Sequence, residues 1–309
     1  MTRLFDTGNI IECVVDEVDL LSLMLKLDID DQGNWVYPDK GIVDVIFNAL
    51  PEYVFAHHEE INNINALVKI REAAKALYNV DSFKAINKYY IENDATYKEE
   101  AEKHTAYKRG EFGEILLHVL LRDFKGTVPL ISKVYFKDSS GVPAHGFDAI
   151  HYSPNDKILW LGESKLYTDG KGGIDDLIND LKEHFTHNFM QEQYTIIKKN
   201  VENSTIPERN YWVERFSKNE RLQDMINNVN IPLLCVYPDE AYKQKLEGAI
   251  TDITKVIETN SRDLKQYFDR KNNAPLKDNL NIILFLFPVR DKHEFAINLH
   301  KKLYSLQNI

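Results

Sequence analysis

One stretch of the chain, residues 158–165, joins an apolar run to a charged end and constrains the fold more than any other. Residues 158–161 (Ile-Leu-Trp-Leu) predict a buried strand. Glu163 and Lys165 follow two residues apart, and on a strand such residues point to the same face. The sequence therefore places a carboxylate and an ammonium group side by side at the end of a buried element.

A second predicted strand precedes this one, and the two form a hairpin. We expect strands at about residues 146–152 and 157–166, joined by a turn at residues 153–156 (Ser-Pro-Asn-Asp). Asp148 and Glu163 lie at nearly equal distances on either side of that turn. Antiparallel pairing then brings the two carboxylates close together, on turn geometry alone.

Upstream, residues 97–121 predict a helix with a break at Gly110. Apolar residues cover most of the circumference of its second half: Phe112, Ile115, Leu116, Leu117, Val119, Leu120 and Leu121. The remaining polar gap holds Glu111, Glu114 and His118. Carboxylates are seldom buried without a partner or a metal ion. This stripe is therefore either a solvated helix edge or part of a functional site.

The order of elements after residue 105 is helix, three strands, helices, strand, helix, strand and helix. Beyond the hairpin and the helix above, we expect a first strand at 128–136, a flexible loop at 168–173, helices at 174–200 and 211–226, a strand at 231–237, a helix at 241–268, a strand at 281–287 and a last helix from Asp291 to about 306. This order predicts an α/β (α+β) fold, with a mixed sheet flanked by helices.

Residues 1–104 form a separate region in this interpretation. We expect it to be mostly helical, with a strand at 10–15 and a segment at 20–27 that fits either helix or strand. It contains no motif with a chemical role, which favours a structural or partner-binding function. Residues 105–309 then form the second domain.

Bulk properties limit the classes of function. The 309 residues have a net charge of −10, whereas autonomous binding of nucleic acid relies on Lys and Arg. A divalent metal or a partner that delivers the nucleic acid would still permit a nuclease. Two distant cysteines, Cys13 and Cys235, favour a reducing compartment. With no membrane-length apolar run or secretory signal, we expect a cytoplasmic protein.

The clustered charges suit hydrolysis of phosphodiester bonds with Mg²⁺, or alternatively Mn²⁺. We expect Asp148 and Glu163 to be metal ligands, with the backbone carbonyl of Ser164 and the carboxylate of Glu114 completing the shell. Lys165 would orient or deprotonate the attacking water, or stabilise the pentavalent phosphorane. Without metal, the crowded carboxylates should have raised pKa values.

Non-catalytic interpretations of these residues are the alternative to a metal site. Taken alone, Glu163-x-Lys165 is most often a surface ion pair. His118, His145 and His151 lack a recognised zinc-ligand spacing, so we interpret them as solvated or structural residues. The Gly-rich residues 170–173 lack the spacing of a P-loop and are interpreted as a connection.

Asp148, a gap, and then Glu163-x-Lys165 resemble the metal-binding signature of the PD-(D/E)XK nucleases. The resemblance implies a restriction-endonuclease-like mixed β-sheet flanked by helices in residues 105–309. More specifically, three segments resemble the HamA family, the small subunit of Hachiman anti-phage defence systems: 110–118 (GEFGEILLH), 145–151 (HGFDAIH) and 162–165 (GESK). The similarity covers roughly residues 105–190 with specific motifs, and the rest mainly by length and element order. One departure is the missing Pro of the nominal Pro-Asp pair before Asp148.

The resemblance implies a DNA-degrading effector restrained by a large superfamily 2 helicase, HamB, until phage or damaged DNA is sensed. Matched by motif, the catalytic set would be Glu114, Asp148, Glu163 and Lys165, with Glu111 as an alternative helix carboxylate. Two other interpretations share these residues: an inactive nuclease fold that serves as a helicase-binding scaffold, and a nuclease acting on RNA.

Overall fold

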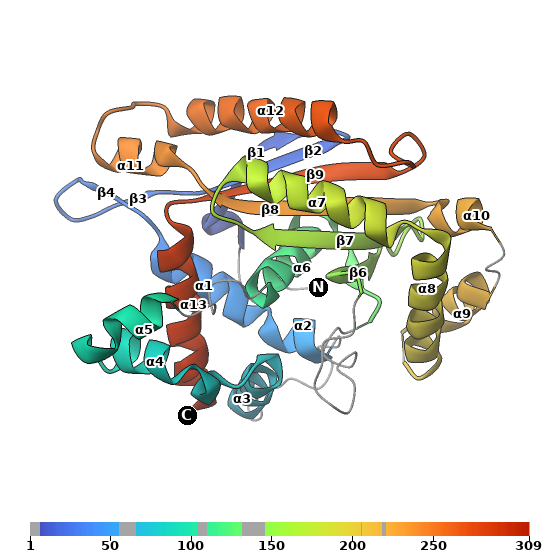
Figure 1. Ribbon diagram of the computed structural model, residues 1–309, viewed down its shortest axis with the longest axis horizontal. Coiled ribbons are helices and arrows are strands. Elements are labelled where there is room, and N and C mark those ends of the chain that lie inside the picture. Colours follow the sequence, from blue (N-terminus) through green and yellow to red (C-terminus); the bar gives the residue numbers. More distant parts are fainter. Residues whose placement is uncertain are drawn as a thin grey trace.

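The computed structural model describes residues 7–55, 66–103, 110–131, 146–204, 206–217 and 221–308. Among these residues, seven strands form one mixed sheet in the order β1-β2-β9-β8-β7-β6-β5 (Figure 1). The strands are β1 Ile11–Asp16, β2 Leu20–Leu25, β5 Val128–Pro129, β6 Ala149–Tyr152, β7 Leu159–Leu166, β8 Val229–Pro238 and β9 Asn281–Val289. Strands β2, β9, β8 and β7 are parallel neighbours, and the other pairings are antiparallel. Strands β3 (Asp28–Ile29) and β4 (Trp35–Val36) form a separate short pair.

Helices flank this sheet, which confirms the predicted α/β class. In chain order, the α-helices are α1 Asp39–Asn48, α2 Leu50–Phe55, α3 Ala66–Leu77, α4 Lys84–Ile86, α5 Lys98–Lys103, α6 Glu111–Lys125, α7 Gly170–His184, α8 His187–Glu202, α9 Arg209–Ser217, α10 Leu222–Ile226, α11 Glu240–Leu246, α12 Ile253–Lys271 and α13 Lys292–Gln307. Short 3-10 or π turns lie at Thr7–Asn9, Val80–Phe83, Asn87–Ile91 and Ala95–Tyr97. No helix in the described part of the chain is both long and apolar enough to cross a membrane.

The sheet separates two apolar cores because its side chains alternate between faces. Trp160 and Leu234 belong to the core that includes α1, α6 and α13. Leu161 and Leu233, each one residue away along its strand, belong to the core that includes α7 and α8. Figure 1 shows α7 and α6 on opposite sides of β7. Strand β7 therefore presents one set of residues to α6 and the next set to α7.

Polar residues fix the ends of the helices around β7. Asp169 caps α7 by accepting a hydrogen bond from the backbone N–H of Gly172, and Asp291 caps α13 in the same way through Glu294. Helix α6 ends at Gly126, whose φ of 64° closes the helix in a left-handed turn. The predicted cap at Asp291 is confirmed.

Three boundaries differ from the sequence-based prediction. The loop expected at 168–173 is wrong, because the Asp169 cap starts α7 at Gly170. The single helix expected at 241–268 is two helices, α11 and α12, separated where Gly248 has a φ of 74° and Asp252 caps the second helix. The helix expected at 211–226 is divided into α9 and α10. Of the strand expected at 128–136, β5 covers the beginning, and residues 132–136 lie outside the described residues.

Strands β1 and β2 join the same sheet as β9, so the sheet extends into the first 25 residues. This settles residues 20–25 as a strand and confirms the strand expected at 10–15. The proposed boundary between residues 104 and 105 stays a prediction. It does not, however, separate two sheets.

Candidate functional site

The hairpin of β6 and β7 brings Asp148 beside the Glu-x-Lys strand, as the turn geometry predicts. Ala149 pairs with Gly162, and Asp148 lies just before β6 begins. The Asp148 Oδ2 atom accepts hydrogen bonds from the Ser164 backbone N–H (2.9 Å) and from its hydroxyl (2.8 Å). The Asp148 side chain thus accepts the backbone hydrogen bond of Ser164 just beyond the point where β6 ends its pairing with β7.

Glu163 is buried, with only 3% of its surface exposed. Its Oε1 atom lies 2.7 Å from Nδ1 of His184, which is the last residue of α7. Burial, together with the nearby charge of Asp148, raises the pKa of Glu163 to about 8, although His184 acts in the opposite direction. The expectation of a raised carboxylate pKa is therefore confirmed at this residue.

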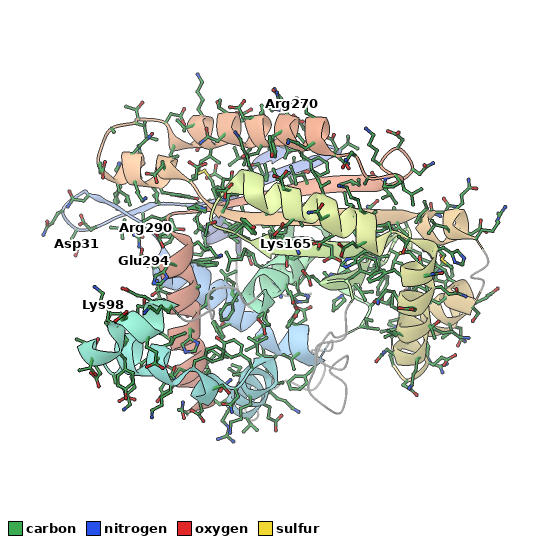
Figure 2. All side chains as sticks on the ribbon, in the orientation of Figure 1. Asp31, Lys98, Lys165, Arg270, Arg290 and Glu294 are labelled. Carbon is green, nitrogen blue, oxygen red and sulfur yellow. The ribbon has the colours of Figure 1, made fainter. Side chains whose placement is uncertain are left out.

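Lys165 lies next to α7 (Figure 2) and is paired with a carboxylate. Its Nζ atom lies 2.7 Å from Oδ2 of Asp180. Burial alone would lower the pKa of Lys165, but the Asp180 carboxylate outweighs burial and raises it. The side chain is therefore an ammonium ion at neutral pH.

Glu114 approaches the site from the other face of the sheet. Helix α6 packs directly on β7. A side chain at Gly113 would bring its Cβ atom within 3.2 Å of Ser164 Oγ, so the close approach needs glycine or a small shift. The Glu114 Oε2 atom accepts a hydrogen bond of 2.5 Å from the hydroxyl of Tyr53 on α2. Burial, the Glu114 contact and the charge of Asp148 raise the pKa of Tyr53. The charge of Asp148 thus raises the pKa of Tyr53, which binds Glu114, and also that of Glu163.

Sequence reasoning missed three residues of this site: Tyr53, Asp180 and His184. Asp180 and His184 are four residues apart on α7 and therefore lie on one face of the helix. We call Glu163, Lys165, Asp180 and His184 the β7–α7 cluster. The available signal was an acidic residue and a histidine at helical spacing, directly after the Glu-x-Lys strand.

The donor atoms suit magnesium better than a metal that needs a complete protein cage. Within the described ranges, no group of three His, Cys, Asp or Glu side chains is arranged to hold a metal ion. Mg²⁺ needs only one or two carboxylates and keeps several waters. Asp148 and Glu163 are such carboxylates. The Ser164 carbonyl leaves the strand on the same side as its N–H group, which Asp148 binds.

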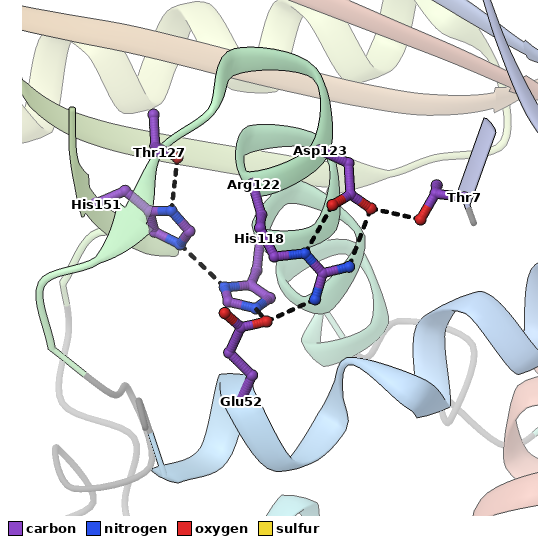
Figure 3. A network of polar contacts seen from close by, with 7 residues as sticks. All are labelled: Thr7, Glu52, His118, Arg122, Asp123, Thr127 and His151. Atoms are coloured by element: carbon purple, nitrogen blue, oxygen red, sulfur yellow. Dashed lines mark hydrogen bonds and ion pairs between the residues drawn. The ribbon is translucent and has the colours of Figure 1, made fainter. Parts of the chain in front are cut away.

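The histidines next to the site are structural (Figure 3). His118 Nδ1 lies 3.0 Å from His151 Nε2, and Thr127 Oγ1 lies 2.9 Å from His151 Nδ1. Glu52 Oε2 lies 3.2 Å from His118 Nε2 and 2.5 Å from Arg122 Nη1. We call this group, which continues through Arg122 to Asp123 and Thr7, the histidine network.

His118 and His151 are both buried, so the solvated alternative is wrong for them. His145 lies outside the described residues. The acidic stripe of α6 is likewise not a solvated edge at its centre, because α2 covers Glu114 and His118 with Tyr53 and Glu52.

A model of the HamA family matches residues 8–303. The chain belongs to the HamA family. HamA is a component of the Hachiman defence system, which supports a role in anti-phage defence. The match extends through both regions of the chain, including β1 and β2. No curated protein matches the chain.

Proposed function

We propose that this HamA-family chain is a metal-dependent deoxyribonuclease, the effector of an anti-phage defence complex that a partner helicase regulates. The observation that supports it most is the meeting of Asp148, Glu163 and Lys165 at one end of a central strand. Three further observations agree with it: the buried acid with a raised pKa, the protonated lysine, and the Glu114 carboxylate beyond Asp148.

Asp148, Glu163 and the Ser164 carbonyl would hold the metal, and Glu114 would extend the shell. A bound Mg²⁺ would supply charge neutralisation at the phosphate and a more acidic water. Glu163 must give up its proton to offer its carboxylate to the metal, while Oε1 keeps its contact with His184. Asp148 is held in place by two hydrogen bonds from Ser164.

Lys165 would act by charge. Because Asp180 raises its pKa, Lys165 keeps its proton at neutral pH and is poorly suited to deprotonating a water. An ammonium ion beside the scissile phosphate would instead stabilise the negative charge that develops in the transition state.

The chain's net charge of −10 makes unaided capture of DNA weak. We therefore propose that a large superfamily 2 helicase, similar to HamB, delivers the DNA in the bacterial cytoplasm and holds the nuclease in check.

Plasmid cleavage with Mg²⁺ tests the proposal, using the chain alone and with its helicase partner and ATP. We expect Glu163→Ala and Lys165→Ala each to lower the cleavage rate about 100-fold or more. The exposed residues Glu183 and Lys171 on α7 provide matched controls, and Glu183→Ala and Lys171→Ala should cleave at the wild-type rate. Cleavage that survives both site substitutions, or is absent in every condition, would favour a scaffold role, while cleavage of RNA alone would change the substrate.

A further inference from the structure

Helix α7 offers β7 a set of charges opposite to its own. The acid Glu163 meets the imidazole of His184, and the base Lys165 meets the acid Asp180. The order is reversed along the chain, with 163 opposite 184 and 165 opposite 180. This is what a helix produces when it returns antiparallel to the strand before it.

The spacing of the two pairs also matches. Two residues along a strand advance about 6.7 Å. Four residues along a helix advance about 6.0 Å. The two contacts can therefore form at the same time without bending either element. An Asp and a His four apart on this helix are thus placed to contact a Glu and a Lys two apart on this strand.

His184 is held in its orientation by aromatic rings. Its ring stacks on Phe189, with centroids 4.3 Å apart and planes at 10°, and meets the edge of Phe147 at 5.9 Å. Phe147 directly precedes Asp148, so the segment that supports the His184 ring also carries the second carboxylate. This packing keeps Nδ1, the nitrogen bonded to Glu163, directed at the strand.

We propose that Asp180 and His184 are positioning residues of the metal site, with His184 orienting the Glu163 carboxylate and Asp180 orienting the Lys165 ammonium. This inference rests on the nuclease function proposed above, and it assigns a role to two residues outside the Glu-x-Lys motif. Partners that hydrogen-bond a metal-ligating carboxylate typically change metal affinity or activity 10- to 100-fold when they are removed. His184 should therefore affect metal affinity, because it acts on a metal ligand. Asp180 should affect the cleavage rate, because it acts on the charged Lys165.

Calorimetric titration of the full-length chain with Mn²⁺, followed by plasmid cleavage, tests this division. We expect His184→Ala and His184→Gln to weaken Mn²⁺ binding about 10- to 100-fold. His184→Asn, whose amide nitrogen lies near the position of Nδ1, should restore binding to within about threefold of wild type. Asp180→Asn should leave the Mn²⁺ affinity nearly unchanged and lower kcat by about tenfold.

His187→Ala is the matched control, because His187 is exposed at the start of α8. Equal Mn²⁺ affinity in wild type and His184→Ala, with weaker binding by Glu163→Ala, would overturn the positioning role alone. If neither wild type nor Glu163→Ala binds Mn²⁺, the proposed function itself fails. Should His184→Ala not fold, the difference between His184→Asn and His184→Gln decides, and equal affinities of those two would overturn the inference.

Discussion

Two buried polar groups lie on opposite faces of the sheet, and they differ in how their charges are balanced. In the histidine network, Glu52 Oε2 lies 3.2 Å from His118 Nε2, and His118 Nδ1 lies 3.0 Å from His151 Nε2. Both ring nitrogens of His151 have a polar partner, because the Thr127 hydroxyl lies 2.9 Å from its Nδ1. Burial, followed by the charge of His118, lowers the pKa of His151, so this ring is neutral in the folded chain.

The β7–α7 cluster consists instead of two ion pairs, Glu163 with His184 and Lys165 with Asp180. Asp148 adds a further carboxylate beside its two ion pairs, and its charge raises the pKa values of Glu163 and Asp180 further, after burial. Three carboxyl groups, those of Asp148, Glu163 and Asp180, therefore face two basic side chains, and the raised pKa of Glu163 means that a bound proton offsets the excess of carboxylates. The comparison shows that burial lowers the pKa of a histidine in one group and raises the pKa of a carboxyl group in the other, next to the partly exposed Lys165.

The sharpest way to break the comparison is to measure stability against pH. Burial and Asp148 raise the pKa of Glu163 to about 8, and the contact with Glu163 raises that of His184 against the effect of burial, so the folded chain holds a proton that the unfolded chain releases. The free energy of unfolding should then fall as pH rises from about 5 to about 8, by up to about 1.4 kcal/mol per pH unit. Urea denaturation of wild type and Glu163→Gln would measure the slope.

Glu163→Gln should flatten this dependence, whereas the exposed substitution Glu183→Gln should leave it unchanged. Identical slopes in wild type and Glu163→Gln would mean that the β7–α7 cluster holds no extra proton.

A substitution in the histidine network should lower stability but leave cleavage nearly unchanged. Glu52→Gln weakens the contacts to His118 and Arg122, although Arg122 keeps Asp123. We expect the free energy of unfolding to fall by about 1–3 kcal/mol at every pH, because the buried charged acceptor of the Arg122 guanidinium is lost. Mg²⁺-dependent cleavage, measured well below the melting temperature, should change less than about threefold. A loss of cleavage comparable to that of Glu163→Ala would erase the distinction between the two groups.

The smallest change in cleavage and stability is expected for a substitution at Tyr53, which binds Glu114. Tyr53→Phe removes the hydroxyl that binds Glu114 but leaves the neighbouring Glu52 in place. The lost hydrogen bond should cost about 1 kcal/mol, which corresponds to about a fivefold slower cleavage if Glu114 serves the site. Unchanged cleavage together with lower stability would assign Glu114 to packing between α2 and α6.

The parts of this site that the sequence predicts are those set by local geometry. The hairpin follows from one turn and two apolar runs, and it brings Asp148 beside the Glu-x-Lys strand as expected, although the contact itself is to Ser164. The buried face of α6 follows from helical periodicity. Asp180 and His184 were not predicted, because their role depends on which strand residues the helix meets after the chain reverses.

Tertiary packing also explains the boundary that was misplaced most clearly. Residues 168–173 look flexible because of their glycines, yet a Cβ atom at Gly173 would lie only 2.5 Å from Cys235 Sγ. The glycine allows α7 to lie against β8, a requirement that only the assembled sheet reveals. By contrast, the division between α11 and α12 was readable from Gly248 and Asp252.

The tight fit at Gly173 gives the chain an internal chemical reporter. Cys235 is fully buried beneath the first turn of α7, while Cys13 is exposed on β1. A thiol reagent should therefore label the folded chain once and reach the second cysteine only when α7 lifts from the sheet. The rate of that second labelling would follow the opening of α7, the helix that carries Asp180 and His184, without the introduction of a new cysteine.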